Sequence, residues 1–329
     1  MTYVNETIDA RHRPGGGISP TVSTVVSTVL AFSKFILVHP NTFMKNRTMR
    51  PDEPRYVRPP RPYEIPAFRE GIRHSTSNEP YLRPTRYCNP REPEIIAMAN
   101  DLGAYEVPDY EFADAAYWFI KDNLTFEMRP LDSAASTLKR GTGTCYHLIS
   151  LFNALCRAAG IKARYKLFAM NYDRYTEGSS RGGIDPLWDG MYNSLGYLMS
   201  EAESEVCIDG EWMVAHPVTP AEIQAAKGLP ATRFGEDSIC VFFDAVPGTI
   251  QHVESVPAGM NSGLTFLLRL SPATGERVAV GYQRATMHGR QVIAEAGGRE
   301  AYDRRAREQL RRAAPTIEIE RDTALVFET

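Results

Sequence analysis

One cysteine, placed where a glycine-rich turn meets an apolar helix, most constrains what this chain can fold into. Residues 141–144 form the turn, and Cys145 follows directly. From 145 to 159, apolar side chains recur at three- and four-residue spacing, which predicts a helix with one wide buried face. Gly160 suits the end of that helix, and the alternating segment 161–170 predicts a half-buried strand. Cys145 is therefore expected at the start of a helix that packs against a sheet.

The position of this thiol favours a chemical role. The first N–H groups of a helix lack partners within the helix and the helix dipole is positive there, so a thiolate is stabilised. The thiolate is the nucleophilic form of cysteine. The alternative is that Cys145 is a small buried hydrophobe, as most free cysteines are. Cys156 shares a helix face with Cys145 and is expected to be a core residue.

The stretch 143–165 resembles the nucleophile segment of the transglutaminase-like superfamily. It contains a Gly-x-Cys turn, an apolar helix ending in Arg-Ala-Ala-Gly-Ile-Lys-Ala-Arg, and a following strand. The resemblance covers residues 90–240 approximately, including expected helices at 93–99 and 113–124. It implies an α+β fold with a papain-like transglutaminase core, in which the nucleophile helix packs on an antiparallel sheet. It also implies that Cys145 is the nucleophile of an acyl-transfer reaction.

In that superfamily a histidine on the second strand and an aspartate on the third complete the catalytic triad. An Asp-Gly pair between two apolar runs predicts a hairpin at 205–215 and gives a reference point for counting. The histidine position is then occupied by Glu201 and the aspartate position by His216. The histidine and the acid are exchanged relative to the family pattern.

Three interpretations of this exchange stay open. In the first, His216 is the base beside Cys145 and Glu201 orients it, because a triad requires these roles rather than a fixed residue on each strand. In the second, Glu201 lies next to the sulfur and raises the thiol pKa by like-charge repulsion. In the third, the site is a relic that serves binding or structure.

A polar, glycine-rich segment with interleaved aromatic residues, 171–193, is expected to form one wall of the substrate cleft. His147 lies two positions after Cys145, so it points to another helix face and is expected near the surface at the cleft mouth. The side chains expected to contact substrate are Tyr146, His147, Tyr175, Trp188 and Tyr192.

Composition excludes several classes of function. A net charge of −3 over 329 residues points to neither nucleic acid nor an anionic membrane. Five irregularly spaced cysteines favour a reducing compartment, and with no visible signal peptide we expect a cytoplasmic protein. The sequence has no Cys-x-x-Cys or His-x-x-x-His pair, so no metal or other cofactor is expected.

Three parts are expected along the chain: an N-terminal helix and Pro/Arg-rich extended arm (1–89), a transglutaminase-like catalytic core (90–245) and a β-rich C-terminal extension (246–329). Residues 18–38 are too polar for a membrane span and are expected to form a helix that docks on the core or on a second subunit. In the extension, strands are expected at 264–270, 277–284 and 316–328, and a basic helix at 300–313.

The expected function is acyl transfer through an acyl-enzyme on Cys145, starting from an amide or thioester carbonyl. Water as acceptor would give an amidase or peptidase, an amine would give an amide-forming biosynthetic enzyme, and a carbon nucleophile would give a cyclase. Expected substrates are a peptide, an amide or an acyl thioester, including one bound to a carrier protein. The alternative is a non-catalytic binding or assembly module that retains the fold with a degenerate triad.

Overall fold

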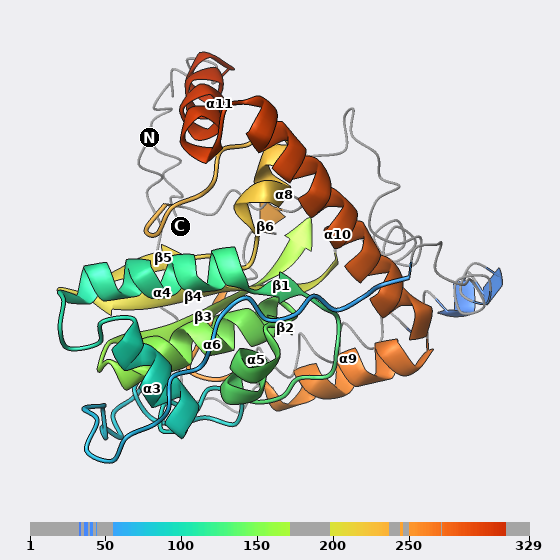
Figure 1. Ribbon diagram of the computed structural model, residues 1–329. Coiled ribbons are helices and arrows are strands. Elements are labelled where there is room, and N and C mark those ends of the chain that lie inside the picture. The colour runs from blue at the N-terminus through green and yellow to red at the C-terminus, as the bar shows by residue number, and fades with distance from the viewer. Residues whose placement is uncertain are drawn as a thin grey trace, which may run out of the picture.

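The computed structural model describes residues 55–171, 198–236, 244–245, 250–270 and 272–313, with positions 33, 36–38, 40, 41 and 44 (Figure 1). It confirms the predicted α+β fold, because helices pack on an antiparallel sheet around one core. The predicted helix at 18–38 lies for the most part outside the described residues. The predicted cleft wall after residue 171 and the predicted strand at 316–328 lie outside them altogether.

Helix α6 (Cys145–Ala158) occupies the centre of the core. Every residue from 146 to 158 is buried, because other helices cover one side of α6 and the sheet covers the opposite side. The covering helices are α3 (Pro93–Asp101), α4 (Asp109–Asn123) and α5 (Ala134–Arg140). Charge is also enclosed here: the guanidinium of Arg157 is fully buried and donates to the carbonyls of Ala163, Arg83 and Glu254.

The main sheet has the order β5-β4-β3-β6, and β7 also pairs with β3. Its strands are β3 (Lys162–Asn171), β4 (Leu198–Ile208), β5 (Glu211–Ala215), β6 (Asp244–Ala245) and β7 (Gln251–Val253), all antiparallel to their neighbours. The predicted hairpin is confirmed: β4 and β5 are joined by Asp209 and Gly210, whose φ angles are 52° and 85°. Positive φ at both central residues is what a two-residue hairpin turn of this twist requires.

A short parallel pair, β1 (Thr125–Phe126) and β2 (Thr142–Gly143), leads the chain into α6. Residues 55–91 contain no helix or strand and run along this pair and the helices (Figure 1). Two bidentate ion pairs hold this segment: Arg58 binds Glu127 at 2.6 and 2.8 Å, and Arg83 binds Glu254 at 2.6 and 2.9 Å. The prediction of an extended arm over 1–89 stays a prediction, because residues 1–54 are mostly outside the described residues and 55–91 also contain turns.

Beyond β7 the described C-terminal residues are helical, so the strands predicted at 264–270 and 277–284 are wrong and the described part of the extension is not β-rich. After α8 (Ala221–Ala226), the chain forms α9 (Ala258–Leu270), α10 (Pro272–Glu295) and α11 (Arg299–Ala313). Pro272 begins α10, where a missing N–H costs nothing, rather than marking a turn between strands. The basic helix predicted at 300–313 is confirmed as α11.

The spacing of apolar residues explains why α9 is a helix, and a close contact shows how α10 packs on α8. Met260, Leu264 and Leu268 recur at four-residue spacing on α9 and pack against the core, which is a helical period. On α10, Gly289 lies so close to the backbone of Glu222 in α8 that a Cβ atom would overlap the Glu222 carbonyl group. The apolar runs at 264–270 and 277–284 are short enough to suit strands, whereas the four-residue period extends along the whole of α9.

Candidate active site

Cys145 is placed at the first position of α6 by a turn that the local sequence specifies. Helix α5 ends at Gly141, whose φ of 77° is left-handed and suits a residue without Cβ. Two residues of β2 follow, and Thr144 takes the extended conformation of an N-cap. The backbone N–H groups of Tyr146 and Ala202 lie near the Cys145 sulfur and act to lower the thiol pKa. One donor comes from the helix start and the other from β4.

The Cys145 thiol interacts directly with the carboxyl group of Glu201 on β4. Glu201 is 9% exposed, and its Oε1 accepts the N–H of Ala202 at 3.3 Å. Counting back from the hairpin places Glu201 at the histidine position of the family. The structure brings this residue and Cys145 together.

The electrostatics of this pair keep the proton on sulfur. Burial and then the neighbouring Glu201 carboxylate raise the pKa of the Cys145 thiol well above its ordinary value, although backbone donors oppose this effect. Burial also raises the pKa of Glu201 to about 7. The helix start alone would have lowered the thiol pKa, but burial and a like charge outweigh the helix dipole here. These are the electrostatics expected when the acid lies next to the sulfur.

His216 is buried, with 5% of its surface exposed, immediately after β5. Because Ala215 pairs with Ser204, the next register position places His216 opposite Glu203 rather than Glu201. Burial, followed by the charges of Lys121 and Lys166, lowers the pKa of His216 to about 3, so its ring is neutral. Within the described ranges, its ring forms no hydrogen bond or ion pair with Cys145 or Glu201.

The prediction that His147 lies near the surface is wrong. The residue is 1% exposed, because the segment before α5 covers the N-terminal end of α6. Tyr146 is also buried, with 5% exposure. Tyr175, Trp188 and Tyr192 lie outside the described residues, so contact of these side chains with substrate stays a prediction.

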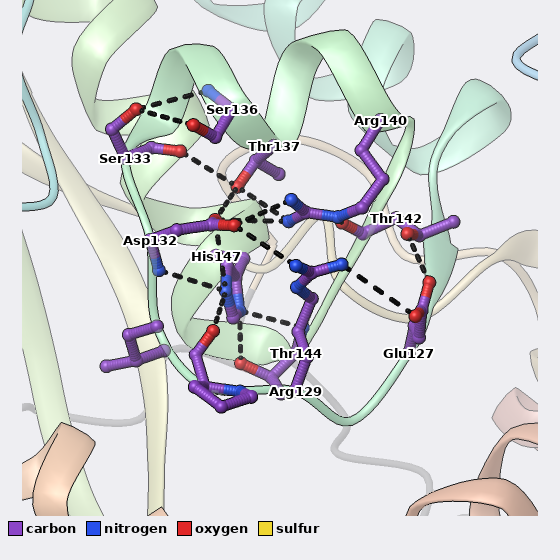
Figure 2. A network of polar contacts seen from close by, with 12 residues as sticks. Glu127, Arg129, Asp132, Ser133, Ser136, Thr137, Arg140, Thr142, Thr144 and His147 are labelled. Carbon is purple, nitrogen blue, oxygen red and sulfur yellow. Dashed lines mark hydrogen bonds and ion pairs between the residues drawn. The ribbon is translucent and has the colours of Figure 1, made fainter. Parts of the chain in front are cut away.

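A polar network that was not predicted from the sequence surrounds His147 (Figure 2). Its ring faces Thr144 on one side and Asp132 on the other, and Arg140 holds Asp132 through contacts of 2.7 and 3.1 Å. Arg129 extends the network, with Nη2 3.5 Å from Asp132 Oδ2 and Nη1 3.8 Å from a carboxylate oxygen of Glu127. The spacing of Thr144 and His147, from N-cap to third helical residue, is that of a capping box and was the available signal.

Two kinds of site are absent from the described residues, a metal-binding cluster and a membrane-spanning helix. Over these ranges, no group of three or more His, Cys, Asp or Glu side chains is arranged to hold a metal ion. Among the helices described, none combines the length and apolar character needed to cross a membrane.

Comparison with known proteins gives one family and a weak structural likeness. No curated protein matches the chain. A crystal structure of a candidate cysteine protease from Cytophaga hutchinsonii shares 23% identity, over 42% of this chain and 40% of that one, with a TM-score of 0.30.

The model of the transglutaminase-like superfamily matches residues 96–217, a range that contains Cys145, Glu201 and His216. This match supports a cysteine-based enzyme in general, and a peptide or amide substrate in general. Residues 96–217 of this chain form a domain of the transglutaminase-like superfamily.

Proposed function

We propose that this protein is a cysteine acyl-transfer enzyme in which Cys145 is the nucleophile and Glu201 carries the proton. The observation that supports the proposal is the direct interaction of the Glu201 carboxyl group with the Cys145 thiol. A general base is most effective when its pKa lies near the working pH, and burial raises the pKa of Glu201 to about 7. The pair therefore combines a nucleophile with a base at hydrogen-bonding range.

The proposed reaction conserves protons at each step. Glu201 takes the thiol proton while the Cys145 sulfur bonds to the carbonyl carbon of an amide or thioester. The protonated Glu201 then gives that proton to the departing amine or thiol, which leaves a thioester on Cys145. An incoming water or amine passes its proton to Glu201 as it attacks the thioester, and the returning proton restores the thiol.

Backbone N–H groups near the sulfur are the proposed stabilisers of the oxyanion. The Cys145 N–H lies at the start of α6, where helical N–H groups have no partner within the helix. Removing one such donor from an acyl-transfer enzyme costs about 10²–10³ in rate. In this proposal the Cys145 N–H receives the charge that develops on the carbonyl oxygen.

This assignment differs from the exchanged triad, in which His216 is the base and Glu201 orients it. That triad stays a prediction. The Glu201 carboxyl group interacts with the thiol, and over the described residues no hydrogen bond joins it to His216. The two assignments separate on replacement of His216 by Asn. Acylation of Cys145 is expected to survive in His216→Asn if Glu201 is the base, and to fall about 10²–10⁴-fold if His216 is the base.

The experiment that tests the proposal uses a small acyl thioester, the S-acetyl derivative of N-acetylcysteamine, as donor. Peptide mass spectrometry after timed incubation compares Cys145 with Cys207, a partly exposed thiol in the same protein. We expect acetylation of Cys145 to exceed that of Cys207 at neutral pH. No acetylation of Cys145, or acetylation no faster than that of Cys207, would refute the proposed function.

One observation favours the second candidate, a non-catalytic binding or assembly module. Burial and Glu201 raise the thiol pKa of Cys145, which makes an unassisted thiol a poor nucleophile. The module predicts that Cys145 stays unmodified by the thioester even after prolonged incubation. The same labelling experiment therefore decides between the two candidates.

A further inference from the structure

The polar network at the start of α6 contains one buried titratable group that the proposed reaction does not use, the imidazole of His147. It lies on the same helical turn as Cys145, and both of its ring nitrogens are engaged. Figure 2 shows the ring between Thr144 and Asp132. The arrangement connects the protonation of a side chain to the backbone turn that carries Cys145.

The contacts assign the tautomer of this ring. Nδ1 lies 3.1 Å from the backbone nitrogen of Thr144, an N–H group that can only donate. Of the two backbone N–H groups that point at the ring, this one is the closer, so we assign the lone pair to Nδ1, and the hydroxyl of Thr144, 2.8 Å away, can donate to it as well. The ring proton then lies on Nε2, which faces the carbonyl of Pro130 at 3.2 Å and Oδ1 of Asp132 at 3.4 Å. With its proton on Nε2, the ring cannot accept the Asp132 N–H, whose nitrogen lies 3.4 Å from Nε2.

The ring has little freedom to choose other partners. A Cβ atom on Gly143 would lie 2.9 Å from Cγ of His147 and closer still to its Cβ, so the turn and the side chain are in contact. On the opposite side, Asp132 is fixed by Arg140, and the N–H of the neighbouring Leu131 donates to Asn261 on α9 at 2.7 Å. Both ends of the imidazole are therefore held by groups that are themselves anchored.

We propose that His147 is a positioning residue for Cys145: its neutral ring holds the Thr144 N–H and thereby the turn before the nucleophile, and protonation of the ring releases this turn. A proton on Nδ1 would face the Thr144 N–H, donor against donor, and only the hydroxyl of Thr144 would remain as acceptor. The structural part stands on the contacts alone. The consequence for catalysis rests on the proposed function.

The charged groups that face His147 determine when it protonates. Asp132 favours the protonated ring, whereas Arg140 opposes it, and Arg129 partly neutralises Asp132 from the segment after β1. Burial is the dominant effect, and the pKa of His147 is lowered from its ordinary value of 6.5. The neutral ring therefore persists at neutral pH, and release is expected only in acid.

The test compares wild type with His147→Gln and His147→Ala in the full-length chain. Glutamine at this position is the usual capping-box residue, so its amide oxygen can accept the Thr144 N–H without titrating. Hydrogen exchange of the peptide containing Thr144 is followed by mass spectrometry from neutral to acidic pH and corrected for intrinsic exchange. This readout does not require activity, so it stands even if Cys145 transfers no acyl group.

We expect protection of this peptide in wild type to fall by about fivefold on acidification, the scale of a lost helix cap. Protection should stay flat in His147→Gln and be low at all pH values in His147→Ala. A wild type and a Gln variant with the same pH dependence would overturn the proposal. So would a ring proton on Nδ1, detected by nitrogen-15 NMR of histidine-labelled protein with His147→Gln used to assign the signal.

Catalysis provides the second readout. If both proposals hold, the rate of Cys145 acetylation in wild type should show an additional decrease at acidic pH. This decrease should be missing in His147→Gln. If Cys145 is never acetylated but the exchange pattern appears, the proposed function fails while the positioning role of His147 stands. If acetylation occurs with identical pH profiles in the two proteins, the positioning role fails alone.

Discussion

Replacement of Glu201 by Gln should make the protein more stable relative to wild type as the pH rises. Burial raises the Glu201 pKa from its ordinary 4.5 to about 7, so the folded state retains a proton that the unfolded state releases. For an acid with a raised pKa, the stabilisation is complete below the ordinary pKa. It is lost as the pH increases through the folded value. Wild type therefore loses stability across this interval, whereas the Gln variant has no such carboxyl group to ionise.

The magnitude follows from the two pKa values. At about 1.4 kcal/mol for each pKa unit, the difference corresponds to about 3 kcal/mol between about pH 4.5 and pH 8. The assay is urea unfolding at several pH values, with the free energy of unfolding from linear extrapolation. Glu211→Gln, on the exposed start of β5, is the matched control and should stay within about 0.5 kcal/mol of wild type. Parallel pH profiles for wild type and Glu201→Gln would refute the reasoning about burial.

Three further changes test other parts of the structure. Gly143→Ala should destabilise the protein by about 1–3 kcal/mol in urea unfolding, because its Cβ would overlap His147. Gly289→Ala should separate α10 from α8 at Glu222 and cost about as much, and an unchanged unfolding midpoint would contradict this packing. The lowered His216 pKa, about 3 against an ordinary 6.5, contributes stability that is complete above 6.5 and is lost as the pH falls. Between about pH 6.5 and pH 3, the free energy of unfolding of wild type should therefore fall by about 5 kcal/mol more than that of His216→Gln.

The central part of the fold could be predicted from the sequence because its signals are local. The apolar spacing from 145 to 159 predicted α6, and the Asp209–Gly210 pair predicted the β4–β5 hairpin. The same hairpin gave the register that placed Glu201 near the thiol. Helices α9 and α10 were not predicted because short apolar runs at 264–270 and 277–284 also suit strands, and Pro272 between them is equally suited to a turn or to the first turn of a helix.

The site was harder to predict because burial decides its chemistry. Helix position alone favours a low thiol pKa for Cys145, whereas burial and Glu201 raise it. Spacing alone placed His147 on a surface face of α6, but the loop that carries Asp132 covers that face. Which segment covers a helix end depends on contacts distant in sequence, and no local pattern in one chain contains that information.

The measurement that most directly tests the central claim is the lifetime of an acetyl group on Cys145. After loading from the acyl thioester, mass spectrometry follows loss of the acetyl group at about pH 8 in wild type, Glu201→Gln and Glu211→Gln, with and without an added primary amine. This step isolates proton removal from the attacking water or amine, because the thiol proton is already gone.

If Glu201 is the general base, the acetyl group should persist about 10²–10⁴ times longer in Glu201→Gln than in wild type or Glu211→Gln. Equal acetyl lifetimes in wild type and Glu201→Gln would contradict the claim that Glu201 carries the proton, and would leave it only the effect of suppressing the thiol.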